Sequence, residues 1–318
     1  MQLPDDVWYY ILSLVPFNVL CRITTTGKLF STAFTRVTKI SNIMMDRVND
    51  KILKKFPRIA SLNLWNNKVI TNAGISSLTN ITSLDLRYNN VITDAGISEL
   101  INITSLNLHS NDVITNAGIS TLSNITSLDL SCNKVITNNG ISSLTSILSL
   151  DLRSNKVITN NGIATLTNIT SLNLHGNKAL TDASVSTLIN IISLNLCDNK
   201  VITNAGISSL TNITALDLVN NNIITDAGIT TLTNMTTLDL SYNKVITNDG
   251  ISTLANIIAL NLRRNDTITD AGISTLTKIT SLNLWSNKVI TDAGISSLTN
   301  ITSLNLCGNN IITNPWLH

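Results

Sequence analysis

His175 and Cys197 are the residues whose types and spacing come closest to a catalytic arrangement. They lie 22 residues apart and occupy equivalent positions in two neighbouring copies of a repeated segment, so we expect them side by side. A thiol–imidazole nucleophile needs that contact, an orienting group (for which Asp198 is near) and an oxyanion hole. We expect the pair on an exposed sheet face, which excludes no water and forms no pocket. The sequence therefore predicts that the chain is not an enzyme.

The histidines and cysteines fit no metal or cofactor motif. His109 and His175 lie three repeats apart, roughly 15 Å at the spacing of neighbouring strands, which is too far to share a metal ion. No glycine-rich phosphate loop and no Gly-x-Ser-x-Gly motif occurs. The intervals between the four cysteines fit neither a zinc site nor a disulfide framework, and we interpret all four as reduced thiols: Cys21, Cys132, Cys197 and Cys307. We predict no metal, no cofactor and a cytoplasmic protein.

The composition argues against nucleic-acid and membrane partners. Charged residues make up 13% of the chain, against about 25% in typical domains, and the net charge is +2. Such a balance gives no strong attraction to nucleic acid or to an anionic membrane. The N-terminus lacks the basic segment of a signal peptide, and no apolar run approaches the roughly 18 residues of a membrane span.

A 22-residue repeat dominates the sequence from residue 59 onward. A Leu-x-Leu pair recurs twelve times at that interval, from Leu62/Leu64 to Leu304/Leu306, and an Asn follows three residues later in every copy. The alternation of apolar and polar residues around each pair is the period of a half-buried strand, so we expect the leucines to point inward. We expect the Asn to turn the chain and to satisfy backbone groups of its own loop and of the neighbouring repeat.

The second half of each repeat predicts a short helix. In the first copy Thr71-Asn72 offers a helix N-cap, and Ile75 and Leu78 are spaced to share one face. Gly74 and its equivalents are expected to permit the close approach of the neighbouring coil. A single unit of strand, turn and helix cannot fold alone, so we expect the units to stack and their strands to form one parallel sheet.

The repeat resembles the leucine-rich repeat. Ile59-x-x-Leu62-x-Leu64-x-x-Asn67 matches the consensus L-x-x-L-x-L-x-x-N/C, and the resemblance covers residues 59–314. It implies an α/β fold: a leucine-rich-repeat solenoid, or horseshoe, with a parallel β-sheet on its concave face. The segment VITDAGI at 91–97 resembles half of the repeat of F-box/leucine-rich-repeat proteins. The 22-residue length is more similar to repeats of bacterial GALA-type effectors and of F-box repeat proteins from large DNA viruses.

The first 58 residues lack the repeat. The motifs Leu3-Pro4-Asp5-Asp6 and Ile11-Leu12-Ser13, with Pro16 at the end of the first helix, resemble an F-box. The F-box is a small all-α module that docks on the adaptor subunit of cullin–RING ubiquitin ligases. The tryptophan that is usual near the third helix of that family is absent, and Leu29-Phe30 stands in its place.

The F-box resemblance divides the chain into three parts. It implies an F-box-like helical domain over residues 1–40, a linker helix or N-terminal cap over 41–58, and the twelve repeats over 59–318. It assigns adaptor binding to Leu3, Pro4, Val7, Ile11, Leu14 and Leu20. In an alternative interpretation, the N-terminal helices only shield the open end of the solenoid, as repeat arrays require.

Variation between repeats concentrates at the seventh and eighth residues of each copy, which follow the strand and are expected to point outward. Trp, Tyr and Arg, the residues that most often dominate protein interfaces, gather there near both ends of the array. We therefore predict that a partner protein binds Trp65, Arg87, Tyr88, His109, Arg153, His175, Tyr242, Arg263, Arg264 and Trp285. Neutral variation at solvent-exposed positions is the alternative.

Together these resemblances imply the substrate-recognition subunit of a cullin–RING ubiquitin ligase. Residues 1–40 would bind the ligase adaptor, and the repeat face would hold an unidentified target protein. The alternative function is a leucine-rich-repeat interaction module with no role in ubiquitin transfer. In either case the expected location is the cytoplasm, and the host cytoplasm if the chain is a viral or bacterial effector.

Overall fold

The structure is a computed structural model that describes residues 49–54, 56 and 58–313. The chain divides into two compact units, Met1–Leu148 and Ser149–His318. The predicted F-box-like domain over 1–40 lies outside the described residues, as do all of its predicted adaptor contacts: Leu3, Pro4, Val7, Ile11, Leu14 and Leu20. The described part is built almost entirely from the repeat.

Each repeat contributes one short strand, and within the described residues one short helix follows each strand from β1 to β11. The strands are β1 (Ser61–Asn63), β2 (Ser83–Asp85), β3 (Ser105–Asn107), β4 (Ser127–Asp129), β5 (Ser149–Asp151), β6 (Ser171–Asn173), β7 (Ser193–Asn195), β8 (Ala215–Asp217), β9 (Thr237–Asp239), β10 (Ala259–Asn261), β11 (Ser281–Asn283) and β12 (Ser303–Asn305). The helices are α4 (Asp50–Leu53), α5 (Asn72–Ile75), α6 (Asp94–Ile97), α7 (Asn116–Ile119), α8 (Asn138–Ile141), α9 (Asn160–Ile163), α10 (Asp182–Val185), α11 (Asn204–Ile207), α12 (Asp226–Ile229), α13 (Asn248–Ser252), α14 (Asp270–Ile273) and α15 (Asp292–Ile295).

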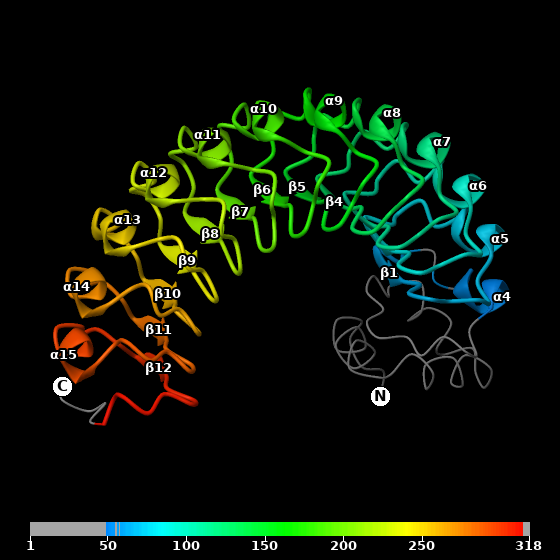
Figure 1. The fold of residues 1–318 in the computed structure, drawn as a ribbon. Helices are drawn as coiled ribbons and strands as arrows, with labels where there is room; N and C mark the ends of the chain where they lie inside the picture. Colours follow the sequence, from blue (N-terminus) through cyan, green and yellow to red (C-terminus); the bar gives the residue numbers. More distant parts are fainter. Residues whose placement is uncertain (1–48, 55, 57, 314–318) are drawn as a thin grey trace, which may run out of the picture. The chain divides into compact units, whose positions relative to one another are not determined.

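The strands of each unit pair in parallel, in chain order and in register. In the first unit β1 to β4 pair so that each leucine faces the leucine 22 residues later, as Leu62 faces Leu84. In the second unit β5 to β12 pair in the same way. Figure 1 shows the strands of the second unit on the inner side of its curve and its helices on the outer side. The predicted α/β solenoid with a parallel sheet is confirmed within each unit.

The core is a stack of identical apolar layers. One coil of the second unit buries six side chains that are at most 1% exposed, three from the strand side and three from the helix side: Ile191, Leu194, Leu196, Ile202, Ile207 and Leu210. The neighbouring coils repeat the pattern, so each layer packs between two others. This stacking supplies the burial that one 22-residue unit lacks.

The invariant asparagine joins successive coils, although Nδ2 of Asn309 in the last repeat has no partner among the described residues. Asn199 is fully buried, and its Oδ1 accepts the backbone N–H groups of Val201 at 3.0 Å and Ile202 at 2.9 Å. Its Nδ2 donates to the carbonyl oxygens of Leu174 at 3.1 Å and Asn177 at 3.0 Å, both in the preceding repeat. The predicted role is confirmed: the side chain satisfies its own loop and the adjacent coil at once.

The helices are shorter than the spacing of apolar residues suggested. α5 ends at Ile75, and Leu78 follows in a tight turn in which its N–H donates to the Ile75 carbonyl at 2.9 Å. Both side chains are buried. Thr71 is the N-cap of α5, as predicted, with extended backbone angles, and its hydroxyl accepts the Ala73 N–H at 3.3 Å.

The first residue of each helix also reaches the next repeat, a contact that the sequence analysis missed. Asp182 of α10 accepts the Thr203 N–H at 2.8 Å and the Thr203 hydroxyl at 2.6 Å. Because that hydroxyl donates to the carboxylate, its lone pair is free to accept the Ala205 N–H of α11. Where the same position is Asn204, its amide donates to the Thr225 hydroxyl, and Thr225 makes no side-chain cap bond.

The glycine of the helix leaves room for this contact. A Cβ on Gly206 would lie 2.5 Å from Oδ1 of Asp182, which is closer than a Cβ atom approaches an atom to which it is not bonded. Only one repeat carries Ser at this position, and there the Ser184 hydroxyl donates to Oδ1 of Asn160 at 2.8 Å. The predicted close approach of neighbouring coils is confirmed, and its cause is the carboxylate or amide of the preceding helix.

Replacing Asn199 by Ala should lower the free energy of unfolding by about 3 kcal/mol or more, because it leaves buried backbone groups without partners at about 1–3 kcal/mol each. Urea-induced unfolding followed by circular dichroism measures the loss. Asn190→Ala is the matched control, since the exposed Asn190 side chain donates one bond, to the Thr167 carbonyl, and should cost about 1 kcal/mol or less. Equal losses in the two variants would contradict the proposed role of the buried amide.

Candidate functional site

After the leucine that follows each strand, two residues precede the asparagine, and the backbone of these two residues is held in a fixed conformation. The N–H of the first, such as His175 or Cys197, is accepted by the side chain at the end of the strand, at 3.0 and 2.9 Å respectively. The second adopts positive φ throughout the described repeats, where glycine or asparagine is most easily placed. We call this pair of positions, over the array, the strand-end face.

Large residues at the second of these positions adopt an unfavourable backbone conformation. Tyr88, Tyr242 and Arg264 have φ of +52°, +58° and +49°, where Gly176 and Gly308 occupy the same place in other repeats. Non-glycine residues with bulky side chains rarely populate this region. Such strain is concentrated at functional sites, so these three residues are candidates for a role beyond folding.

The structure brings four of the predicted residues together in the first unit. The guanidinium carbon of Arg87 lies 5.8 Å from the Trp65 ring centroid, and the Tyr88 and His109 rings meet edge to face at 5.0 Å. Trp65 is 60% exposed and Tyr88 is 49% exposed. Arg87 also forms an ion pair with Asp85, Nη2 to Oδ2 at 2.6 Å, which raises the pKa of Arg87 through that hydrogen bond. We call these four residues the first aromatic–arginine cluster.

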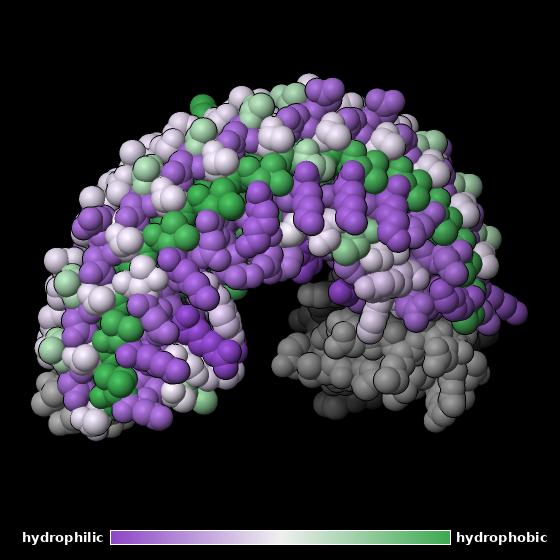
Figure 2. All heavy atoms as spheres, in the orientation of Figure 1, coloured by the Kyte–Doolittle hydropathy of each residue, from purple (hydrophilic) through white to green (hydrophobic). Residues whose placement is uncertain are grey.

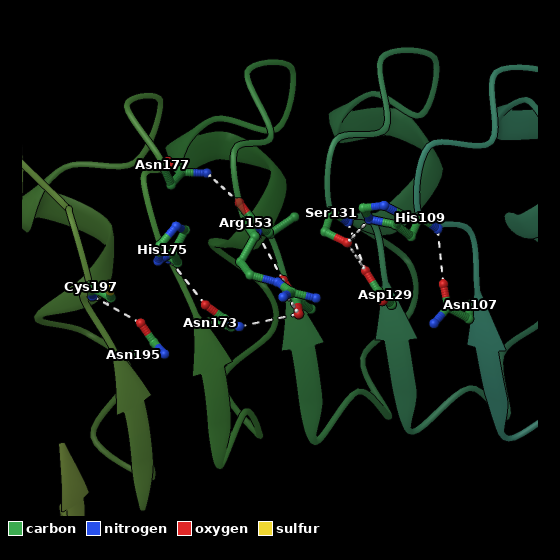
Figure 3. A network of polar contacts seen from close by, with 12 residues as sticks. Asn107, His109, Asp129, Ser131, Arg153, Asn173, His175, Asn177, Asn195 and Cys197 are labelled. Atoms are coloured by element: carbon green, nitrogen blue, oxygen red, sulfur yellow. Dashed lines mark hydrogen bonds and ion pairs between the residues drawn. The ribbon is translucent and has the colours of Figure 1, made fainter. Parts of the chain in front are cut away.

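A chain of hydrogen bonds fixes the His109 ring (Figure 3). The Ser131 hydroxyl donates to Oδ1 of Asp129 at 2.5 Å, so it must accept from Nδ1 of His109, also at 2.5 Å. Nδ1 then carries the ring proton, and Nε2 accepts the Tyr88 hydroxyl at 2.8 Å. Asp129 and the buried Ser131 are supports that sequence reasoning missed. Their signal was an Asp at the end of the strand, two residues before a Ser.

Four further predicted residues meet in the second unit. Arg263 stacks on Trp285, with its guanidinium carbon 3.5 Å from the ring centroid, and lies 5.4 Å from the Tyr242 centroid. Arg264 lies 5.6 Å from the same tyrosine ring. Nε of Arg263 is buried and has no hydrogen-bond partner among the described residues. We call Tyr242, Arg263, Arg264 and Trp285 the second aromatic–arginine cluster.

The remaining two predicted residues belong to neither cluster. Arg153 folds back on Asp151, with Nε 3.0 Å from Oδ2, and Asp151 also accepts the Asn173 amide at 3.2 Å. His175 is half-buried and lies next to Cys197, as their equivalent positions predicted. One ligand atom from each of His175, Cys197 and Asp198 lies within 4.8 Å of the others.

Acidic neighbours shape the chemistry around Cys197. Burial, together with the charges of Asp217 and Asp198, raises the pKa of Cys197 to about 12. Burial also raises the pKa of Asp217, and the charge of Asp239 on the paired strand adds to the rise, while the N–H of Val219 opposes it. A thiol that is protonated at neutral pH is the opposite of an activated nucleophile.

The family of the chain follows from the repeats themselves. The model of the Leucine Rich repeat family matches residues 77–101, 99–123, 121–145, 143–166, 209–232, 231–255, 256–276 and 275–298, which together make up more than half of the chain. The chain belongs to the leucine-rich-repeat family. No curated protein sequence matches this leucine-rich-repeat chain.

Solved structures share the leucine-rich-repeat fold with this chain. An internalin (inlF) from Listeria monocytogenes str. 4b F2365 is 23% identical, with a TM-score of 0.55 and 87% of each chain covered. The functional domain of InlJ from Listeria monocytogenes is 24% identical, with a TM-score of 0.56, 89% of this chain and 59% of that chain covered. A chain of the TLR13–ssRNA13 complex is 21% identical, with a TM-score of 0.61, 88% of this chain and 49% of that chain covered. At these identities the similarity shows the fold alone.

The face of the second unit that is visible in Figure 2 is largely polar. Figure 2 shows, on the visible face of the second unit, one narrow apolar band bordered by polar side chains. Within the described residues, no helix combines the length and the apolar character that crossing a membrane requires.

Cys197 should resist alkylation at pH 8 although it lies on the strand-end face. A pKa of about 12 leaves roughly one thiol in 10⁴ ionised at pH 8, against roughly a quarter for an ordinary cysteine, and the side chain is only 9% exposed. Peptide mapping after iodoacetamide treatment should show the exposed Cys307 modified before Cys197. The Cys197 rate should rise about tenfold per pH unit above pH 8. Equal rates for the two cysteines at pH 8 would show that the thiol is not suppressed.

Proposed function

We propose that this leucine-rich-repeat chain is a protein-interaction subunit that recognises a target protein for a cullin–RING ubiquitin ligase. The strand-end face holds the target, and residues 1–40 dock on the ligase adaptor. In this proposal the chain itself catalyses no reaction and acts in the cytoplasm, or in the host cytoplasm if it is an effector. The observation that carries target binding is the pair of aromatic–arginine clusters.

The chemistry of the two clusters favours a protein as the target. Trp and Tyr lose little conformational entropy for the contact area they offer, and Trp, Tyr and Arg are the residues most enriched at interface hot spots. In the second cluster the stacked Arg263 and Trp285 are held ready for contact before any partner arrives. Tyr88, Tyr242 and Arg264 keep bulky side chains at strained positions, which favours selection for recognition over neutral variation.

The link to ubiquitin transfer is supported by the sequence of the N-terminal segment. Leu3-Pro4 followed by the Ile11-Leu12 helix and Pro16 is the part of the chain that resembles an F-box. By this resemblance the adaptor would contact Leu3, Pro4, Val7, Ile11, Leu14 and Leu20.

One observation favours the alternative, a leucine-rich-repeat module whose N-terminal segment is only a cap. α4 precedes the first repeat, and Asp50 accepts the Thr71 N–H at 2.9 Å and the Thr71 hydroxyl at 2.6 Å. These are the contacts that a repeat helix makes with its successor. Leu53 of α4 and Phe56 are fully buried, so these two side chains cover the first apolar layer. Such a cap is compatible with adaptor binding by residues 1–40.

Adaptor binding by the full chain tests the ligase proposal. We expect the purified chain to retain the ligase adaptor in a pull-down, and we expect Leu3→Ala combined with Pro4→Ala to abolish retention, because both residues fall in the segment that would contact the adaptor. Trp285→Ser lies on the strand-end face and should leave adaptor binding unchanged. The ligase proposal fails if the double variant retains the adaptor as well as the unaltered chain does, or if the unaltered chain retains no adaptor. Either result would favour the alternative, an interaction module with no role in ubiquitin transfer.

Target binding is tested separately by proximity labelling in cells with variants drawn from the repeat itself. Ser occupies the first strand-end position in Ser131 and Ser241, and Asn occupies the second in Asn66 and Asn220. Trp65→Ser with Tyr88→Asn, and Trp285→Ser with Arg264→Asn, therefore remove each cluster with residues that the fold already accepts. We expect each pair to remove labelled proteins that the control Val219→Ser retains, at unchanged thermal stability. If both double variants label the same proteins as the unaltered chain, the two clusters are not the binding site.

A further inference from the structure

Three side chains that can ligate a metal ion converge in the second unit. His175 and Cys197 lie just beyond the ends of two neighbouring strands, β6 and β7 (Figure 3). One ligand atom from each of His175, Cys197 and Asp198 lies within 4.8 Å of the other two, and Sγ of Cys197 is 3.8 Å from Oδ2 of Asp198. In a tetrahedral zinc site, with bonds of about 2.0–2.3 Å, ligand atoms lie about 3.4–3.6 Å apart. Side-chain rotations that move the ligand atoms by about 1 Å would bring them to the separations of a zinc site.

The ligands are already oriented by their surroundings. The Asn220 amide donates to Oδ1 of Asp198 at 2.5 Å, which leaves Oδ2 directed toward Cys197. The backbone N–H groups of His175 and Cys197 are fixed by the asparagines that end their strands. No described residue forms a hydrogen bond with the His175 ring, so its nitrogens are available. Supports of this kind position ligands in known metal sites.

The charge around the three ligands favours a cation. Asp217 and Asp239 lie on the next two strands, and neither forms an ion pair with a described residue. The carboxylates at the ends of β2 and β5 differ, because Arg87 and Arg153 neutralise them. Asp198, Asp217 and Asp239 therefore place three carboxylates near the Cys197 thiol, and none of the three forms an ion pair with a described residue. This concentration of negative charge attracts a positive ion.

We propose that His175, Cys197 and Asp198 bind a Zn²⁺ ion, with the fourth coordination position left to water. Mixed nitrogen, sulfur and oxygen donors suit zinc, whereas Mg²⁺ and Ca²⁺ take oxygen ligands. On binding, the S–H bond of Cys197 breaks, its proton passes to solvent, and the thiolate sulfur bonds to the metal. The sequence analysis predicted no metal site because it considered only whether His109 and His175 could share an ion. The proposed ligands are instead His175 and, from the next repeat, the consecutive residues Cys197 and Asp198.

The experiment uses the untagged full chain and Co²⁺ as a spectroscopic probe, followed by competition with Zn²⁺. We expect one Co²⁺ per chain, a thiolate-to-cobalt charge-transfer band, and displacement of Co²⁺ by Zn²⁺. Cys197→Ser should abolish the band. His175→Gln and Asp198→Asn should each weaken Zn²⁺ binding about tenfold or more. Asn suits the positive φ of position 198, so that variant tests the carboxylate and not the turn.

Two controls probe the same residue types elsewhere on the strand-end face. Cys307→Ser removes an exposed thiol that is followed by Gly308, and His109→Gln removes a histidine in the first unit; both should leave the Co²⁺ band and the Zn²⁺ affinity unchanged. The proposal is overturned if the unaltered chain gives no band, if the band survives Cys197→Ser, or if Cys307→Ser removes it. If circular dichroism shows that Cys197→Ser is unfolded, the other two variants decide the matter. Unchanged Zn²⁺ affinity in both His175→Gln and Asp198→Asn would then overturn the proposal.

Discussion

The hydrogen bonds of one buried asparagine per repeat determine where each coil can lie on the next. At that point the chain leaves the sheet, so its backbone groups have no strand to pair with and no water within reach. The Asn199 amide donates to two carbonyl oxygens of the preceding coil, while its oxygen accepts two N–H groups of its own loop. No other side chain of that size offers two donors and a double acceptor in one plane. The apolar layers can close because this polar requirement is met between successive coils; among the described residues, Asn309 of the last repeat is an exception, since its Nδ2 has no partner.

The same constraint explains why variation is confined to two positions per repeat. The strand ends two residues before the first residue of the strand-end pair, and the asparagine directly follows the pair. The backbone of the pair therefore has one conformation, with positive φ at its second residue. The side chains of these two residues take no part in the apolar layers. Their chemistry can change from Trp65 to Ser131 or Cys197 without altering the coil, and a rigid frame presents each of them at a defined place.

The side chain of the residue that ends each strand accepts a backbone hydrogen bond from the turn that follows. Its side-chain oxygen holds the next turn, and where it is an aspartate its charge must be balanced. Asp85 and Asp151 are balanced by an arginine two residues later, and Asp129 is stabilised by the hydroxyl of Ser131. Asp217 and Asp239 receive only neutral donors: the side-chain amides of Asn195 and Asn261, and the backbone N–H groups of Val219 and Ser241. The negative potential that raises the pKa of Asp217 and of Cys197 is therefore a local property of the second unit.

Period, strand, cap and glycine could all be predicted from the sequence, because each is a local pattern that the chain repeats in nearly every copy. The same equivalence of repeats placed His175 beside Cys197. The F-box over residues 1–40 rests on sequence alone and stays a prediction. Only the tertiary structure decided which side chains touch: Arg263, and not Arg264, stacks on Trp285, His109 is held by Ser131 and Tyr88, and Asp182 reaches forward to Thr203. Such contacts join residues 21 or 22 positions apart, and their rotamers and hydrogen-bond directions depend on the neighbouring coil, which no single copy of the repeat encodes.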